Sequence, residues 1–129
     1  MVKTSLVEND IADGRRLIAA LNQINSHFHL QAAFWLYRPE AMEWRFMVAT
    51  PLVDQKGPFS TYSDVQSILR TIVPPLSISM QDISVVSPND KLVKVLRRAA
   101  HIPPGASGVR FGRSRVDDTY VEDAYMYRV

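Results

Sequence analysis

Residues 32–53 are rich in apolar and aromatic side chains and read AAFWLYRPEAMEWRFMVATPLV. The stretch is typical of two strands joined by a short loop at Pro39. A strand with one face in water alternates apolar and polar residues, because successive side chains point to opposite faces. Here Phe34 points one way while Trp35 and Tyr37 point the other, so neither face is polar. We therefore predict a central hairpin with helices on one face, and what covers the other face becomes the main question.

Apolar residues at helical spacing predict two amphipathic helices on either side of this hairpin. The first covers residues 6–24 and follows a capping-box signature. The second begins at Ser60 or Thr61, after a turn-rich loop over residues 54–58. It ends at the proline pair 74–75, because proline lacks the N–H that continues a helix.

A third helix is predicted after residues 87–90, which read SPND. This segment offers Ser87 as the N-cap, proline at the first helical position and an acid at the third. The helix runs to about Ala100. Its apolar positions, which we expect to be buried, are Leu92, Val95, Leu96 and Ala99. Its polar face, which we expect to be exposed, carries Lys91, Lys94 and Arg98.

Three further strands are predicted at residues 78–86, 108–116 and 119–128. The last two form a hairpin joined at Asp117 and Asp118. A two-residue turn there fixes the pairing of the hairpin. The predicted pairs are Val116 with Thr119, Arg113 with Glu122, and Phe111 with Ala124.

The elements follow the order α-β-β-α-β-α-β-β, which predicts an α+β protein with a single domain over residues 1–129. We expect a two-layer α/β sandwich: one mixed sheet of about five strands, with all three helices on one face. Each helix has a single apolar stripe, and such helices cover one face of a sheet.

Composition sets the broad class of protein. The chain has 129 residues, of which 47% are hydrophobic and 22% charged, with a formal charge of +2 and no cysteine. These values are typical of a soluble globular domain, and the absence of cysteine excludes disulfides and thiolate metal sites. The first ten residues do not resemble a secretion signal, and no apolar run reaches the length of a membrane span. We expect a cytoplasmic protein.

Candidate catalytic and metal-binding groups are sparse. His27 and His29 form an H-x-H pair that needs a third ligand before it can hold zinc or iron. The acids near the last hairpin are better explained as turn residues and strand positions on opposite faces; they are Asp117, Asp118, Glu122 and Asp123. Motifs for an activated serine or a phosphate-binding glycine loop are missing. We expect no metal and no cofactor, and favour a protein that is not an enzyme.

The favoured function is binding to another protein, including a second copy of the chain as a homodimer, through the open face of the sheet. Large apolar patches of this kind mark interfaces, whose cores are enriched in aromatic residues, Met and Arg. The predicted interface consists of Trp35, Tyr37, Arg45, Met47, Tyr125 and Tyr127.

Two alternatives stay open. A nucleic-acid-associated regulator would use a basic segment around the third helix, where Asp90 is the sole acid between residues 90 and 116. Its predicted contacts are Lys91, Lys94, Arg97, Arg98 and Arg110. The second alternative is a small enzyme or ligand-binding domain with a pocket at the sheet surface.

Overall fold

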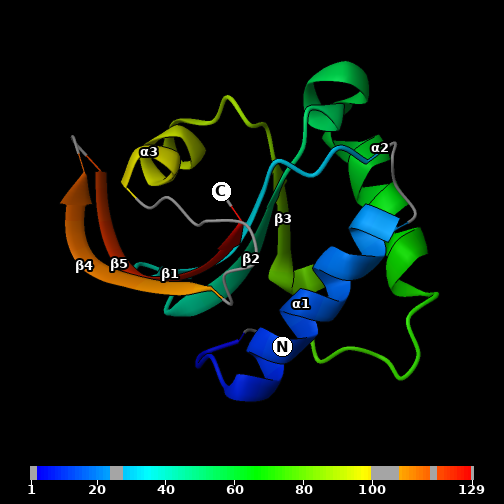
Figure 1. Cartoon of the computed structure of the whole chain (residues 1–129), viewed down its shortest axis with the longest axis horizontal. Coiled ribbons are helices and arrows are strands. Elements are labelled where there is room, and N and C mark those ends of the chain that lie inside the picture. The colour runs from blue at the N-terminus through cyan, green and yellow to red at the C-terminus, as the bar shows by residue number, and fades with distance from the viewer. Residues whose placement is uncertain (1–2, 24–27, 100–107, 117–118, 129) are drawn as a thin grey trace.

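A computed structural model describes residues 3–23, 28–99, 108–116 and 119–128 (Figure 1). Its elements form an α+β fold with three helices and one mixed five-stranded sheet, in the predicted order. The elements are α1 (Glu8–Gln23), β1 (Ala32–Arg38), β2 (Glu43–Ala49), α2 (Leu52–Leu69), the short 3-10 helix η1 (Met80–Asp82), β3 (Ile83–Val86), α3 (Lys91–Ala99), β4 (Val109–Val116) and β5 (Thr119–Arg128). Among the described helices, none is long and apolar enough to cross a membrane.

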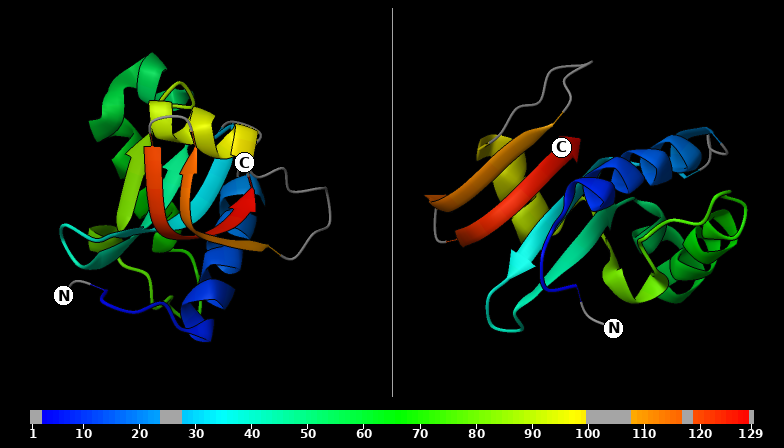
Figure 2. Two further views of the ribbon diagram at one scale, coloured as in Figure 1. Left: turned by 90° about the vertical axis from the view of Figure 1, so that its left-hand side faces the viewer. Right: turned by 90° about the horizontal axis from the view of Figure 1, so that it is seen from below.

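The strand order across the sheet is β3-β2-β1-β5-β4, so the predicted central hairpin lies inside the sheet. Neighbouring strands are antiparallel except for β2 and β3, which are parallel. Figure 2 shows β4 in orange beside β5 in red. Their pairing is as predicted at Phe111 with Ala124 and at Val116 with Thr119. Arg113 and Glu122 are not themselves a ladder pair in these described strands, and Arg113 has a left-handed φ of 49°. The pairs on either side, Gly112 with Asp123 and Ser114 with Val121, keep the predicted register.

The helices lie on both faces of the sheet, so the prediction of three helices on one face is wrong. Leu17 and Leu21 of α1 and residues of α2 pack in one core with Trp35 of β1. Val93 and Leu96 of α3 pack on the opposite face, in a second core with residues of β1, β2 and β5. Figure 1 shows α3 across the sheet from α1 and α2. The hairpin is apolar on both faces, so both faces must be shielded from water. Helices α1 and α2 shield one face and α3 shields the other.

Two helices differ from their predicted bounds for local reasons. α1 begins at Glu8, two residues later than predicted, and Val7, which precedes it, is exposed. α2 begins earlier than predicted, at Leu52, and bends at Gly57, whose φ of 85° leaves the helical region just before Pro58. The predicted loop over residues 54–58 therefore contains a helical turn and the bend.

Acidic side chains account for the start of β3 and of α3. Strand β3 is shorter than predicted because Asp82 accepts a hydrogen bond from the Ser79 N–H, 3.0 Å away, and closes η1 in front of the strand. The N-cap of α3 is Asp90, whose Oδ1 accepts from the Leu92 N–H at 2.9 Å. Ser87, the predicted cap, instead accepts from Asn89 N–H in the preceding turn.

Two buried carboxylates of α1 hold the segment between α2 and β3. Asp13 accepts from the Ser77 N–H at 2.7 Å and from Arg16 at 3.2 Å. Asp10 accepts from the Ser77 hydroxyl at 2.9 Å and from Lys3 at 3.0 Å. Burial disfavours the Asp13 carboxylate, but the hydrogen bonds from Ser77 and the charge of Arg16 outweigh it and lower the pKa of Asp13. These hydrogen bonds hold α1 against the segment that leads into β3.

Candidate functional site

The six residues of the predicted interface do not form one surface. Trp35 and Tyr127 belong to the core beneath α1, together with Tyr37 and Tyr125 at its edge. Met47 belongs to the core beneath α3, on the opposite face of the sheet. The strand alternation that places Trp35 opposite Phe46 across β1 and β2 separates the two groups.

Trp35 is fully buried within the chain and is not available to a partner. Its Nε1–H donates a hydrogen bond to the Tyr127 hydroxyl at 3.0 Å, which in turn donates to the Ile11 carbonyl of α1 at 2.7 Å. Gly14 lets α1 approach this pair, since a Cβ there would lie 2.3 Å from the Tyr127 hydroxyl oxygen. Burial raises the pKa of the Tyr127 phenol. This face is therefore covered by α1, which corrects the predicted open face.

Arg45, another residue of the predicted interface, is hydrogen-bonded to β3 and to η1, which precedes it. Its guanidinium donates to the Ser84 hydroxyl at 2.7 Å and to the carbonyls of Gln81 and Ile83, each at 2.8 Å. These bonds occupy its donors along β3. Tyr62 of α2 adds a further contact there, accepting a hydrogen bond from the Val85 N–H at 3.0 Å.

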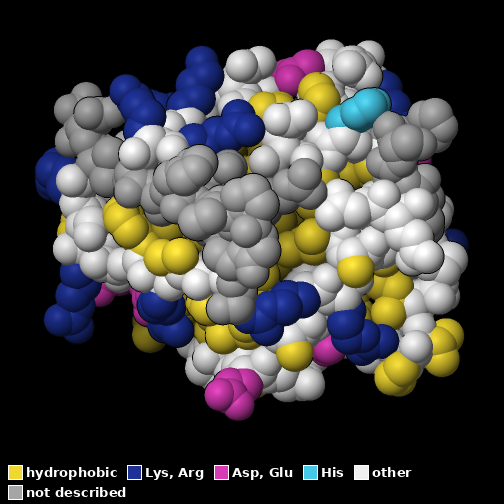
Figure 3. Space-filling view, viewed as in Figure 1, with side chains coloured by type: hydrophobic (Ala, Val, Ile, Leu, Met, Phe, Trp, Pro, Cys, Tyr) yellow, Lys and Arg dark blue, Asp and Glu magenta, His cyan; other side chains and the backbone are white. Residues whose placement is uncertain are grey.

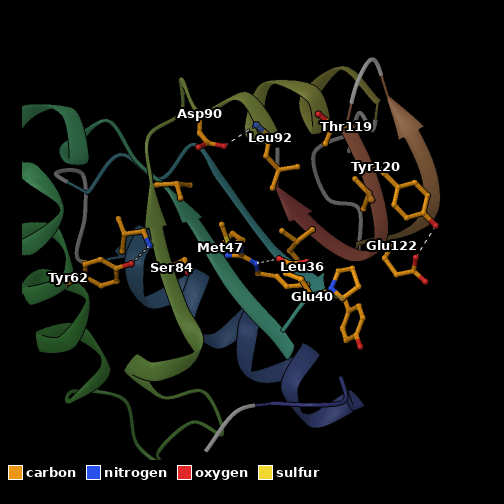
Figure 4. A pocket seen from close by; sticks show the side chains of 16 residues that line it. Leu36, Glu40, Met47, Tyr62, Ser84, Asp90, Leu92, Thr119, Tyr120 and Glu122 are labelled. Atoms are coloured by element: carbon orange, nitrogen blue, oxygen red, sulfur yellow. Dashed lines mark hydrogen bonds and ion pairs between the residues drawn. The ribbon is translucent and has the colours of Figure 1, made fainter. Parts of the chain in front are cut away.

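A groove remains on the α3 side of the sheet, where α3 covers the strands at one end only. The groove has a volume of about 600 Å³ and crosses the strands from β3 to β5. Figure 4 shows its labelled residues, with Asp90 and Leu92 at the start of α3 on one side and Leu36 and Met47 on the strands. Its walls and floor are formed by Leu36, Tyr37, Arg38, Pro39, Glu40, Met47, Tyr62, Ser84, Val85, Val86, Asp90, Leu92, Thr119, Tyr120, Val121 and Glu122.

The floor of this groove is apolar and continuous with the core beneath α3. Met47 and Val121 are buried members of that core, and Leu36 and Leu92 pack against it. The rim residues Arg38, Glu40, Asp90 and Tyr120 are exposed. A ligand in the groove would therefore contact apolar side chains below and charged or hydroxyl groups at the rim.

The charges at the rim are mainly negative. Glu40, Asp90 and Glu122 contribute three carboxylates, and Arg38 contributes one guanidinium. Arg38 donates to Glu40 at 3.0 Å, and the pKa of Glu40 is lowered by its own backbone N–H and by Arg38. Tyr120 is half-exposed and donates to Glu122 at 2.9 Å, and this hydrogen bond raises the pKa of the phenol. The groove is acidic although the whole chain has a formal charge of +2.

The predicted basic segment divides between two places in the fold. Lys91, Lys94, Arg97 and Arg98 are exposed on α3. Arg110 lies on β4, donates two hydrogen bonds of 2.7 Å to Asp123, and stacks 5.3 Å from the Trp44 ring. Because Trp44 belongs to the core on the α1 side, Arg110 does not join the α3 cations. The carboxylate of Asp123 raises the pKa of Arg110.

The predicted burial on α3 is largely confirmed. Val95 and Leu96 are buried, as predicted, and Leu92 is half-buried. Val93, which the prediction omitted, is fully buried. The side chain of Ala99 lies outside the described residues.

The remaining candidates bring no catalytic group together in the described part of the chain. His27, Asp117 and Asp118 lie outside the described residues, and His29 is exposed. Among the described residues no group of three or more His, Cys, Asp or Glu side chains is placed to hold a metal ion.

A pocket at the sheet surface was one alternative from the sequence, but the position of this groove, its lining residues and its acidic rim were not predicted. The groove is lined by the β1–β2 turn, by the start of α3 and by β5. These three segments are far apart in the sequence. One signal was present: α3 has nine residues and is about 13 Å long, too short to cover strands of 7 to 10 residues. Comparison with models of protein families, with curated proteins and with solved structures finds no match.

Proposed function

We propose that the protein is a binding protein that takes up an extended, basic segment of a partner protein in the groove beside α3. The observation that carries this proposal is the groove itself, with its apolar floor and its acidic rim. It keeps the protein-binding function expected from the sequence and moves the contact from the Trp35 face to the α3 face of the sheet.

The dimensions of the groove suit a short peptide segment. The groove crosses the four neighbouring strands β3, β2, β1 and β5. Three strand spacings of about 4.8 Å give a length of about 14 Å, which matches about four residues of extended chain. Small-molecule sites enclose most of the ligand surface, whereas the rim here is exposed over several charged residues.

The charge of the groove selects the kind of segment. Asp90 and Glu122 lie on different elements at the rim, so two basic side chains of a bound segment would each meet a carboxylate. Ion pairs at exposed positions contribute about 0.5 kcal/mol each, so charge contributes to selectivity while the apolar floor contributes most of the affinity. A segment that alternates Arg or Lys with Leu fits both features.

The proposal is tested with a capped six-residue peptide of alternating Arg and Leu and a matched peptide with Glu in place of Arg. The protein carries ¹³C-labelled methionine methyl groups, and NMR spectra are recorded during titration. Met47 lines the groove, while Met80 packs against the core on the other face. We expect the Arg peptide to shift the Met47 methyl signal and leave the Met80 signal unchanged.

The variant Asp90→Asn with Glu122→Gln removes two rim charges and keeps the helix cap, because Asn is as good an N-cap as Asp. We expect it to weaken the Arg peptide about fivefold, from two ion pairs of about 0.5 kcal/mol each. The control variant Glu8→Gln with Asp64→Asn makes the same charge change on α1 and α2 and should bind like the wild type. An unshifted Met47 signal, or an equal response to the Glu peptide, contradicts the proposal.

A further inference from the structure

Helix α3 has a cationic side that is separate from the groove. With about 100° between successive helical residues, its four basic side chains lie within an arc of about 120°. These residues are Lys91, Lys94, Arg97 and Arg98. The buried residues Val93, Val95 and Leu96 occupy the other side of the helix. Figure 3 shows Lys and Arg side chains gathered over the part of the molecule where α3 lies in Figure 1.

Three of the four cations on α3 are not neutralised by neighbouring acids in the described part of the chain. There, Lys91, Lys94 and Arg97 have no carboxylate within salt-bridge distance, and Arg97 donates to the Gln31 side chain at 3.3 Å. Asp90, the nearest acid in the sequence, forms no ion pair with these three residues in the described structure. Six cations elsewhere in the described fold are paired with acids, namely Lys3, Arg16, Arg38, Arg45, Lys56 and Arg110. The whole chain has a formal charge of only +2, but α3 carries four basic residues and no acid.

The composition of this side of α3 favours phosphate over a protein surface. Each exposed residue described on the helix is Lys or Arg, and the four apolar residues at positions 92, 93, 95 and 96 are buried or half-buried. Protein interfaces have an apolar core and are depleted in Lys. A polyanion needs only a row of cations, because counterion release drives its binding.

The spacing of the cations matches a nucleic-acid backbone. Lys91, Lys94 and Arg98 follow one another along the helix, and seven residues at 1.5 Å each span about 10 Å. Each strand of a duplex presents a phosphate about every 3.4 Å along its axis, so this row lies beside about three phosphates. We propose that the basic side of α3 binds the phosphate backbone of nucleic acid, without reading its sequence.

The test is fluorescence anisotropy with a labelled mixed-sequence DNA duplex and the corresponding single strand. With three phosphate contacts, affinity for the duplex should fall about 40-fold between about 50 and about 200 mM salt. The variant Lys91→Gln with Lys94→Gln should bind more weakly and lose about 3- to 4-fold over the same range, because one contact remains. The single strand should show a shallower dependence on salt.

The control variant Lys56→Gln with Arg70→Gln removes two exposed charges from α2 and should bind DNA like the wild type. Circular dichroism and urea midpoints establish that both variants fold. No binding by the wild type at low salt overturns the proposal. It is also overturned if the α3 variant binds like the control, or if polyglutamate displaces the labelled DNA as effectively as unlabelled DNA does.

Discussion

Replacement of Gly14 by Ala tests how closely α1 packs on the sheet. In an exposed helix this change stabilises by about 0.5–1 kcal/mol, because Gly loses more backbone entropy on folding. At Gly14 the new Cβ would lie 2.3 Å from the hydroxyl oxygen of Tyr127 and 3.1 Å from Phe46. The first distance is more than about 1 Å short of a normal contact. Either α1 or the Tyr127 ring must move.

Movement of Tyr127 is opposed by its two hydrogen bonds, to Trp35 and to the Ile11 carbonyl. Overpacking of a core costs about 1–3 kcal/mol, and the gain in helix propensity offsets part of it. We therefore expect Gly14→Ala to lower the free energy of unfolding by about 1–2 kcal/mol.

Urea denaturation of the wild type, Gly14→Ala, Tyr127→Phe and the double variant measures this effect. Tyr127→Phe alone should cost about 1–3 kcal/mol, because it leaves the Trp35 N–H buried without an acceptor. The double variant should lose less free energy of unfolding than the sum of the two single changes. Without its hydroxyl the ring at position 127 has no hydrogen bonds and can shift away from the new methyl group. The variant Ala19→Gly, at an exposed position of α1, measures helix propensity alone. A Gly14→Ala protein more stable than the wild type would refute the close packing of α1 on Tyr127.

Two further predictions concern acidic side chains. The lowered pKa of Asp13 means that its ionised form stabilises the fold above its usual value of 3.8, and that this contribution is lost as the pH falls through the folded pKa. The difference in free energy of unfolding between the wild type and Asp13→Asn should therefore be largest near neutral pH and shrink in acid, and a difference independent of pH would contradict the assignment. Asp90→Ala should lower the free energy of unfolding by about 1 kcal/mol and Asp90→Asn should change it little, as an N-cap requires. Equal urea midpoints for these two variants would argue against Asp90 as the cap of α3.

Much of the fold could be predicted because its signals are local. The pairing of β4 with β5 follows from a two-residue connection and the alternation of each strand, and Phe111 does face Ala124. The side of the sheet that α3 occupies could not be predicted, because an apolar stripe shows that a helix is buried and not on which face. The hairpin did contain a relevant signal, since Phe34 and Trp35 are both large and point to opposite faces. From the sequence this signal predicts an interface, whereas in the structure helices of the same chain cover both faces.

The groove and the anchoring acids depend on contacts between residues far apart in the sequence. Asp13 meets Ser77 across 64 positions, and no local pattern links the two. The groove requires Asp90 and Glu122 to lie at one rim, which follows only once α3 and β5 are placed together. The basic side of α3, by contrast, was predictable from helical spacing. That Arg110 lies apart from it, bonded to Asp123, could be learned only from the structure.

The most direct test of this account is the hydrogen exchange of the Trp35 indole N–H, followed by ¹⁵N NMR at low and at high protein concentration. Trp35 is fully buried beneath α1 and its N–H donates to Tyr127 within the same chain. We predict strong protection that does not change with protein concentration, because α1 of the same chain covers Trp35. Rapid exchange, or protection that rises with concentration, would contradict it and show that the face of the sheet bearing Trp35 is covered only by association.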